Sequence, residues 1–511
     1  MSVVTPKGAA TQAIGSGTVA PPRSRTLHDL VRDLPEAELR GGADVLVSSL
    51  CYRSDDARPG ALFFCVPGSA SDGHAFAGDA VARGSSAIVV DRWLELDVSQ
   101  VRVPDVRGAM GPISAAFYGR PADGMTVVGV TGTNGKTTTT YLLEAILRAD
   151  GRIPGVIGTT GVRVDGRPEP FPRTTPEAPD LHRLVATMAD EGVTAIAMEV
   201  SSHGLHQHRV DGIRYSVAVF TNLTQDHLDY HASMREYFLA KSRLFTPAMS
   251  DRAVVNLDDR WGRDLVGSGL PTITYGLASD SDVRATDVEW TVEGISFLAD
   301  GVPIRSALRG SFNVENALAA FAAARSLGIE DITAAEAISS VRVVPGRVES
   351  VEVGQGFLVL VDYAHTPDSV ENVLRAARSL TGGRLIVVLG AGGDRDRVKR
   401  PLMGRAATAT ADLAVITSDN PRSEDPLEII AEIMPGAEQG GGRFVVEPDR
   451  RAAIRLAMEE ASPGDVVVIA GKGHEAYQEL ADRTIPFDDR AVAEDELRSI
   501  GKATRPLGAT R

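Results

Sequence analysis

Cysteine is nearly absent from this sequence of 511 residues, which contains only Cys51 and Cys65. Two cysteines are too few for a disulfide framework or a four-cysteine zinc site, and such low usage is typical of a protein in the reducing cytoplasm. We therefore expect a cytoplasmic protein in which both thiols pack in a core.

Long apolar runs and an excess of positive charge are also missing. No stretch reaches the roughly 18 consecutive apolar residues of a transmembrane helix, so we expect no membrane insertion. The formal net charge is −15, and a field of that sign repels polyphosphates at long range, which disfavours non-specific binding to nucleic acid. Any phosphate that the protein binds must be held by a local site.

The remaining composition is that of a globular protein, with 43% hydrophobic and 24% charged residues. A chain of this length predicts about three domains. Clusters of proline and glycine indicate linkers between them, and the two ends of the chain are rich in small and polar residues. The predicted division is a disordered extension at 1–25, an N-terminal domain at 26–123, a central domain at 124–343, a C-terminal domain at 344–501 and a tail at 502–511.

Apolar runs alternate with helical patterns, which predicts an α/β fold. In the central domain the runs at 194–198 and 216–220 are apolar throughout, as in strands that a parallel sheet buries on both faces. Four runs predict a second, mostly parallel sheet in the C-terminal domain: 357–361, 384–389, 413–417 and 466–470. We expect a doubly wound central sheet and a Rossmann-like C-terminal domain, with ligands at the carboxyl ends of the strands.

A glycine-rich loop, Thr131-Gly-Thr-Asn-Gly-Lys-Thr-Thr138, lies between a strand-like run at 125–130 and a helical pattern. Backbone N–H groups and a helix N-terminus at such a turn can hold phosphate. Lys136 would neutralise the β- and γ-phosphates of a nucleotide, and Thr137 would offer its hydroxyl to Mg²⁺. The predicted ATP contacts in this phosphate loop are Gly132, Thr133, Asn134, Gly135, Lys136, Thr137 and Thr138.

The phosphate loop departs from the common G-x-x-x-x-G-K-[ST] pattern, because Val130 stands where the first glycine is expected. A plain turn with an exposed lysine is the alternative, but the strand before the loop and the helix after it favour nucleotide binding. The sequence has no Asn-Lys-x-Asp motif of the kind that selects guanine, which disfavours a GTPase.

Further motifs follow the loop: Met198-Glu-Val-Ser-Ser-His203, Thr221-Asn-Leu-Thr-Gln-Asp-His-Leu-Asp229 and Ala240-Lys241. Together with the loop they resemble the Mur ligase family, and the resemblance runs from about Tyr52 to Glu475 with the motifs in family order. It implies a three-domain α/β enzyme that uses ATP to phosphorylate a carboxylate. An incoming amine then attacks the acyl phosphate and gives an amide, ADP and phosphate. The domain at 26–123 would bind UDP, the domain at 124–343 would be the ATPase, and the domain at 344–501 would bind the amino acid.

The resemblance also implies a magnesium site. Thr137, Glu199 and His227 match metal ligands of the family, and Lys241 matches a lysine that is N6-carboxylated and helps to hold a second Mg²⁺. The expected catalytic residues are Lys136, Lys241, His227 and Glu199. Taken singly, each has a plainer role, such as a strand-end carboxylate or a helix-surface charge. The histidines at 203, 206 and 208 lack a cysteine or fourth ligand at a typical zinc spacing, so packing or substrate contact is expected for them.

Several motifs resemble the family members that add meso-diaminopimelate to the D-Glu carboxylate of UDP-MurNAc-L-Ala-D-Glu in peptidoglycan synthesis. Residues that match contacts to the muramoyl dipeptide are Thr174, Thr175, Ser201, Gln207 and Arg209. Residues that resemble the uridine and diphosphate contacts are Tyr52, Ser54, Ser69, Ala70 and Ser71. The family's usual Asp-Ser-Arg reads Arg53-Ser-Asp55 here, so only the serine is kept.

The C-terminal domain carries residues that resemble a diaminopimelate pocket: Arg395, Asp419, Asn420, Pro421, Arg422, Gly471 and Glu475. A bidentate pair between Arg422 and the distal carboxylate would disfavour lysine, because leaving that arginine unpaired costs about 2–5 kcal/mol. Implied adenine and ribose contacts are Asn316, Arg347 and Asp362. The place of Arg347 at the linker suggests that ATP draws the C-terminal domain closed.

Two alternatives stay open. A lysine-adding ligase of the same family would differ in the diamino acid, whereas a non-catalytic regulator that binds the UDP precursor would be expected to lose Lys136, Thr137 or Lys241, all of which are present. Folylpolyglutamate synthetase shares the loop and fold but should lack the uridine domain. We expect a monomer whose partners are small molecules: UDP-MurNAc-L-Ala-D-Glu, meso-diaminopimelate and ATP.

Overall fold

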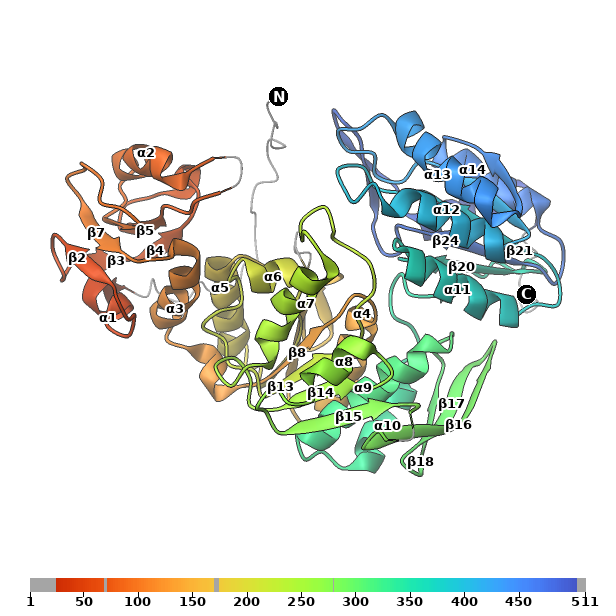
Figure 1. Cartoon of the computed structure of the whole chain (residues 1–511), viewed down its shortest axis with the longest axis horizontal. Coiled ribbons are helices and arrows are strands. Elements are labelled where there is room, and N and C mark those ends of the chain that lie inside the picture. The colour runs from red at the N-terminus through yellow and green to blue at the C-terminus, as the bar shows by residue number, and fades with distance from the viewer. Residues whose placement is uncertain (1–23, 69–70, 170–173, 279, 503–511) are drawn as a thin grey trace, which may run out of the picture.

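The computed structural model describes residues 24–68, 71–169, 174–278 and 280–502 (Figure 1). Ser69 and Ala70, most of the predicted extension at 1–25 and the predicted tail beyond Lys502 lie outside the described residues. Three α/β regions follow one another along the chain, and each contains one large sheet. The domain boundaries remain predictions. No helix among the described residues is both long and apolar enough to cross a membrane.

The N-terminal region is built on a five-stranded sheet in the order β2-β7-β6-β5-β4. Cys51 and Cys65 are both buried and free, as expected. The elements are β1 (Arg25–Thr26), α1 (Leu27–Val31), β2 (Glu38–Arg40), β3 (Leu46–Val47), β4 (Ser49–Cys51), β5 (Ala61–Phe64), α2 (Ala77–Ala82), β6 (Ala87–Val90), β7 (Ser99–Arg102) and α3 (Val106–Tyr118).

The central sheet has eleven strands in the order β11-β10-β9-β12-β8-β13-β14-β15-β16-β17-β18. The strands from β9 to β16 are parallel, as predicted, whereas both edges are antiparallel hairpins that the sequence did not reveal. The strands are β8 (Thr126–Thr131), β9 (Pro154–Gly158), β10 (Gly161–Val164), β11 (Arg167–Glu169), β12 (Ala195–Glu199), β13 (Val217–Phe220), β14 (Ala253–Asn256), β15 (Thr272–Gly276), β16 (Val283–Thr291), β17 (Gly294–Ala299) and β18 (Val302–Ser306).

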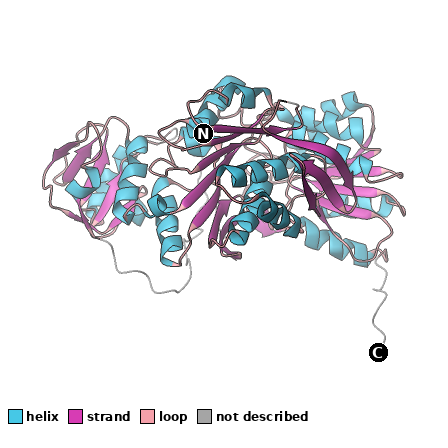
Figure 2. Ribbon diagram, turned by 90° about the horizontal axis from the view of Figure 1, so that it is seen from below, coloured by secondary structure: helices cyan, strands magenta, loops and turns pink. Residues whose placement is uncertain are grey.

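Helices cover both faces of this sheet (Figure 2). Side chains of a strand alternate between faces, so Val127 joins one core with α5, while Val128 and Val130 join the other with α4 and α9. This burial on both sides explains why the strands are apolar without alternation. The helices are α4 (Lys136–Ala149), α5 (Ala178–Asp190), α6 (Ser202–His206), α7 (Met234–Ser242), α8 (Arg260–Leu265), α9 (Phe312–Ser326) and α10 (Asp331–Ser340).

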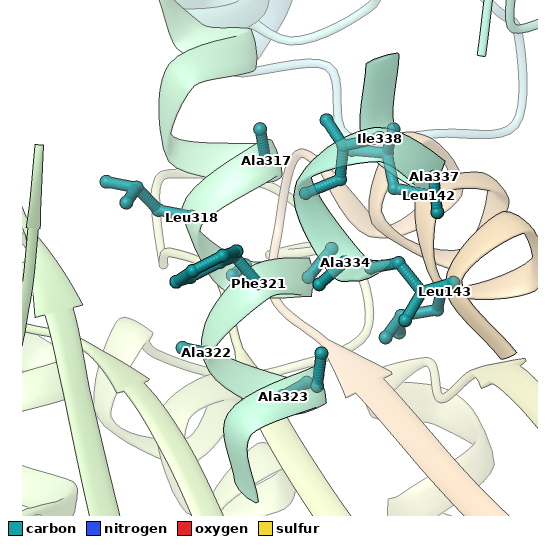
Figure 3. Close-up of a cluster of buried hydrophobic side chains, with 14 of the residues drawn as sticks. Leu142, Leu143, Ala317, Leu318, Phe321, Ala322, Ala323, Ala334, Ala337 and Ile338 are labelled. Atoms are coloured by element: carbon teal, nitrogen blue, oxygen red, sulfur yellow. The ribbon is translucent and has the colours of Figure 1, made fainter. Parts of the chain in front are cut away.

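Helix α4 is held by α9 and α10 in a core of leucine, alanine and phenylalanine (Figure 3). Leu142 and Leu143 of α4 pack there with Phe321 of α9 and Ile338 of α10, all fully buried. Alanines of α9 and α10 occupy little space and let the helix backbones approach closely. Because each buried leucine contributes about 1.5–3 kcal/mol, the core fixes the N-terminus of α4, where the phosphate loop ends.

The C-terminal sheet has the order β19-β20-β24-β21-β22-β23 and is parallel except for β19. Lys502, the first residue of the predicted tail, donates from Nζ to the backbone oxygens of Met458, Glu459 and Ala461. The elements are β19 (Glu349–Ser350), β20 (Leu358–Asp362), α11 (Pro367–Ser379), β21 (Leu385–Leu389), α12 (Lys399–Thr410), β22 (Leu413–Ile416), α13 (Pro426–Gly440), β23 (Arg443–Val446), α14 (Arg450–Glu460), β24 (Val466–Ala470), β25 (Tyr477–Glu479), β26 (Thr484–Pro486) and α15 (Asp489–Ser499).

Candidate active site

The phosphate loop leaves β8 and enters α4 through Gly135, whose φ of 86° lies in the left-handed region. A Cβ at this position would collide with Asn316 Oδ1, so the close approach of α9 also requires glycine. Asn316, a predicted ATP contact, is thereby placed directly beside the loop. Its Nδ2 donates to Asn313 Oδ1 at 2.8 Å, which fixes the orientation of the amide.

The side chain of Lys136 lies over the phosphate loop. Its Nζ donates to the backbone oxygens of Gly132 at 2.9 Å and Thr133 at 2.7 Å. Burial lowers the pKa of this ammonium, and the nearby Glu199 carboxylate partly opposes that effect. An ammonium held at the loop by backbone oxygens can turn to a bound phosphate without a large rearrangement.

A second segment, Thr221-Asn222, supports the phosphate loop from β13. Thr221 Oγ1 donates to the backbone oxygen of Asn134 at 2.6 Å, and Asn222 Oδ1 accepts from Asn134 N–H at 2.9 Å. Both residues belong to the Thr221–Asp229 motif, but no role was predicted for them from the sequence. Their position immediately after a parallel strand was the available signal.

Glu199 is the last residue of β12 and is only 1% exposed. Its carboxylate accepts from Thr159 N–H at 2.8 Å and from Thr159 Oγ1 at 2.9 Å. Thr137 is the second residue of α4 and directly follows Lys136. The hydroxyl oxygen of Thr137 accepts from Arg347 Nη2 at 2.8 Å. The strand end and the helix start therefore carry oxygen ligands of the kind that Mg²⁺ prefers.

His227 lies on the loop after β13 with a φ of 56°. Burial lowers the pKa of its imidazole to about 3, although the adjacent Asp226 carboxylate acts in the opposite direction. The ring is therefore neutral at physiological pH, and only the neutral imidazole has a lone pair for a metal.

The residues present fit a magnesium site that protein and substrate share. The described residues contain no cluster of three or more His, Cys, Asp or Glu side chains able to hold an ion by themselves. Mg²⁺ typically uses one or two protein carboxylates together with substrate phosphates and water, so one carboxylate at Glu199 beside the phosphate loop is compatible with it.

Lys241, in the last turn of α7, is buried to 1% exposure. Its Nζ donates to the backbone oxygen of Gly132 at 2.8 Å. Burial, reinforced by the positive charge of Lys136, holds the pKa of this amine well below its ordinary value. A neutral amine is the form that can add CO₂, so the environment suits the carboxylation that the sequence resemblance implies.

The C-terminal region contacts the phosphate loop and its surroundings directly. Asn134 Nδ2 donates to Asp368 Oδ2 at 2.9 Å, and Lys399 Nζ lies 3.1 Å from Asp226 Oδ1. Together with the bond from Arg347 to Thr137, these contacts join the central and C-terminal sheets around the loop. Asp368 and Lys399 were not predicted as site residues, since no local sequence pattern links residues so far apart in the chain.

The Lys399–Asp226 pair is buried, with side-chain exposures of 7% and 6%. Burial opposes ionisation of Asp226, but Lys399, His227 and His365 together hold the pKa of the carboxyl below its ordinary value. Lys399→Met would leave the buried carboxylate without its ammonium, and we expect a loss of about 3–5 kcal/mol in the free energy of unfolding. Thermal and urea denaturation measure this loss. The exposed pair Arg498–Glu494 provides the control, because Arg498→Met should change the free energy by about 1 kcal/mol or less.

The residues predicted to contact the dipeptide lie beside Glu199. Thr175 Oγ1 donates to the backbone oxygen of Glu199 at 3.1 Å and accepts from Ser201 N–H at 3.1 Å. Arg209 Nη1 donates to the backbone oxygen of Thr175 at 3.2 Å, and Arg209 Nη2 donates to Gln207 Oε1 at 2.6 Å. Thr174 Oγ1 is 3.1 Å from Thr159 Oγ1, so it joins the same network.

Arg209, one of the predicted dipeptide contacts, has a carboxylate partner in the structure. Its Nε lies 3.1 Å from Glu177 Oε1, in a pair with side-chain exposures of 15% and 9%. Any substrate carboxylate that reaches Arg209 therefore shares the guanidinium with Glu177.

Of the predicted uridine and diphosphate contacts, the structure describes Tyr52 and Ser54, which follow β4, and Ser71, which follows β5. Tyr52 OH donates to Asp180 Oδ2 of α5 at 2.8 Å, which links the N-terminal and central regions. Ser54 begins a short 3-10 helix at Ser54–Asp56, and Ser71 is exposed. Their role in binding stays a prediction.

The predicted diaminopimelate residues converge at the strand ends of the C-terminal sheet. Arg395 and Arg422 both lie close to Gly392. A Cβ added to this glycine would be 3.0 Å from Arg422 Nη1 and 3.7 Å from Arg395 Cγ. Asn420 Nδ2 donates to Glu475 Oε2 at 2.7 Å, and burial together with the neighbouring Asp419 raises the pKa of Glu475. The fully buried Lys472, which the sequence analysis missed, donates to Asn420 Oδ1 at 3.0 Å.

One assumption about this pocket is wrong. The predicted penalty against lysine rested on an Arg422 without a partner, but Arg422 Nε donates to Glu479 Oε2 at 3.0 Å. A lysine substrate would leave the arginine paired with Glu479, so the penalty of about 2–5 kcal/mol is an upper bound.

The remaining predicted ATP residues lie where the two later regions meet. Arg347 stacks over Tyr363 with 4.8 Å between guanidinium carbon and ring centre. Asp362 Oδ2 accepts from Val348 N–H at 2.8 Å, and burial raises the pKa of the carboxyl. Beside Arg347 is a polar cavity of about 240 Å³, which Arg309 and Glu349 also line.

Sequence models for two domains match this chain. The Mur ligase middle domain matches residues 130–324, and the Mur ligase glutamate ligase domain matches residues 346–473. The chain belongs to the Mur ligase family. Both matches fall on the regions described above: the first contains the phosphate loop, Glu199 and Lys241, and the second contains the Asp419–Arg422 loop.

Relatives within the Mur ligase family match over nearly their whole length. The UDP-N-acetylmuramoyl-L-alanyl-D-glutamate–2,6-diaminopimelate ligase of Geobacillus thermodenitrificans is 49% identical over 482 residues, which cover 91% of this chain and 98% of that protein. A solved structure of a ligase with the same name is 32% identical and covers 94% of this chain and 99% of its own, with a TM-score of 0.66.

A more distant Mur-type fold is the folylpolyglutamate synthase of Mycobacterium tuberculosis complexed with ADP and AMPPCP. It is 19% identical with a TM-score of 0.61 and covers 78% of this chain but 96% of its own. At this identity the likeness concerns the fold alone.

Proposed function

We propose that the protein adds meso-diaminopimelate to the D-Glu carboxylate of UDP-MurNAc-L-Ala-D-Glu, using ATP, in cytoplasmic peptidoglycan synthesis. The observation that carries this proposal is the Asp419–Arg422 loop, which lies beside Arg395 and Glu475 in a chain that also has the phosphate loop. The relatives that bear the name of this activity cover 91% and 94% of the chain, which supports the proposal.

In the proposed reaction, the D-Glu carboxylate attacks the γ-phosphorus of ATP. The bond to ADP breaks, and an acyl phosphate forms. The amine of diaminopimelate then attacks the acyl carbon, phosphate leaves with its bonding electrons, and the ammonium proton is lost to water. Lys136 and the backbone of the phosphate loop would hold the transferred phosphoryl group, since this chemistry depends on positioning and charge stabilisation.

Thr137, Glu199, His227 and a carboxylated Lys241 are the proposed magnesium ligands. When bound, Mg²⁺ would neutralise the charge that develops on the phosphoryl oxygens. Arg347, Asn316 and Asp362 would bind the nucleoside from the two later domains. Thr175, Ser201 and Arg209 would orient the dipeptide so that its carboxylate faces the phosphate loop.

The proposed active form is a monomer, because the described residues of a single chain supply the phosphate loop, the dipeptide residues and the amino-acid pocket. Both substrates of the first step are charged and water-soluble, which fits the cytoplasm that low cysteine usage predicts.

The direct test is ligation by the purified protein with meso-diaminopimelate and L-lysine in parallel, scored by the mass of the UDP-tripeptide. We expect product with meso-diaminopimelate and little with lysine. Arg422→Ala should lower kcat/KM for meso-diaminopimelate by about 10²-fold, because it removes a bidentate charge-assisted pair. ATP hydrolysis that depends on the UDP-dipeptide should persist in the variant.

The alternatives give different results in the same assay. Product with L-lysine alone would identify the lysine-adding reaction instead. Binding of the UDP-dipeptide without any amide product would favour the non-catalytic regulator.

A further inference from the structure

A hairpin of β25 and β26 lies along the Asp419–Arg422 loop. Gln478 Nε2 donates to the backbone oxygen of Asp419 at 2.6 Å. At the next residue, Glu479 N–H donates to Asn420 Oδ1 at 2.9 Å. Strand β25 is therefore tied to the predicted amino-acid pocket at two consecutive positions.

Glu479 contacts Arg422 through both backbone and side chain. Arg422 N–H donates to the backbone oxygen of Glu479 at 3.0 Å, and Arg422 Nε donates to Glu479 Oε2 at 3.0 Å. From another direction, Arg422 Nη1 donates to the backbone oxygen of Gly393 at 2.7 Å. Because the guanidinium is planar, two acceptors at different nitrogens fix its orientation.

Arg422 needs such restraint. Its φ of 52° is in the left-handed region, which residues other than glycine seldom adopt. An arginine side chain also has many rotamers, and a ligand that had to order it would bind more weakly.

The pair is only partly shielded from solvent, with side-chain exposures of 20% for Arg422 and 35% for Glu479. Ion pairs with this much exposure contribute little to the stability of a fold. Its effect on the direction of the guanidinium is therefore more important than its effect on folding.

We propose that Glu479 is a positioning residue for amino-acid specificity: it holds the Arg422 guanidinium in the orientation that receives the distal carboxylate of the diamino acid. Glu479 acts through Arg422. The inference rests on the proposed function, because it concerns the amino-acid substrate of that site.

The test is the full-length Glu479→Ala variant, with KM and kcat measured for each substrate. We expect KM for meso-diaminopimelate to rise about tenfold, the size of one lost charge-assisted hydrogen bond, while KM for ATP and for the UDP-dipeptide stays within about twofold. Glu479→Gln should recover most of the loss, since its amide oxygen can still accept from Arg422 Nε. The matched control is Glu494→Ala, which removes an exposed carboxylate of α15 that pairs with Arg498.

Selectivity separates this role from a structural one. The ratio of kcat/KM for meso-diaminopimelate to that for L-lysine should fall about tenfold in Glu479→Ala, because lysine has no distal carboxylate for Arg422. If kcat/KM fell equally for both amino acids, including a fall caused by unfolding of the variant, the proposal would be overturned.

A double variant gives an independent check. In an Arg422→Ala background, Glu479→Ala should add no further loss, because the partner through which it acts is gone. Additive losses would contradict the proposal. Failure of the proposed function is a separate result, since the unsubstituted protein would then form no UDP-tripeptide with meso-diaminopimelate.

Discussion

Lys136→Ala is expected to abolish phosphate release, with a fall in kcat of about 10³-fold or more. The ammonium lies over the phosphate loop and donates to the backbone oxygens of Gly132 and Thr133. Alanine removes the cation that would neutralise the transferred phosphoryl group. Phosphate release with ATP, UDP-dipeptide and meso-diaminopimelate present measures the effect.

Lys502→Ala is the matched control, because Lys502 also donates to backbone oxygens but lies at the far end of the chain. It should leave kcat unchanged. Lys136→Ala protein that still folds, as judged by circular dichroism, and keeps more than about a tenth of the original kcat would argue against phosphoryl transfer at this loop.

Lys241→Ala is expected to lower kcat by about 10²–10³-fold, because the carboxylated side chain would be lost from the metal site. Lys241→Arg should be equally inactive, since a guanidinium stays charged and cannot be carboxylated. Acetate or formate added to Lys241→Ala should restore part of the activity by placing a carboxylate in the vacated space. No such recovery is expected for Lys136→Ala.

The low pKa of Lys241 gives this prediction a pH dependence. Only the neutral amine adds CO₂, and burial, which lowers the pKa of Lys241, increases the fraction of the amine that is neutral. Protein freed of CO₂ at low pH should therefore be inactive and should regain activity when bicarbonate is added at neutral pH. Mass spectrometry of a Lys241 peptide would detect the added carboxyl group, and full activity in rigorously CO₂-free buffer would refute its role.

The parts of the fold set by local patterns could be predicted from the sequence. The apolar run at 125–130 corresponds to β8 at Thr126–Thr131, and the run at 466–470 is β24. Strand-end residues such as Glu199 were also found, because their position follows from the end of an apolar run. The antiparallel hairpin β16–β17–β18 was missed, since its exposed strands lack a continuous apolar pattern.

Long-range pairs could not be predicted. Lys399 and Asp226 are 173 residues apart, and Glu479 and Arg422 are 57 apart, with no spacing rule that links them. Such pairs form only when folding brings together two sheets, or a hairpin and a loop. The assumption that Arg422 has no partner in the free pocket was wrong for this reason.

The left-handed backbone at Arg422 restricts how the pocket can be redesigned. Its φ of 52° and the crowding of Gly393 against the Pro421 carbonyl leave little freedom for the main chain. Valine, isoleucine and threonine are poorly suited to such a conformation, whereas asparagine, aspartate and glycine tolerate it. Libraries intended to accept new amino acids should therefore draw on the latter residues at 422 and leave Gly393 untouched.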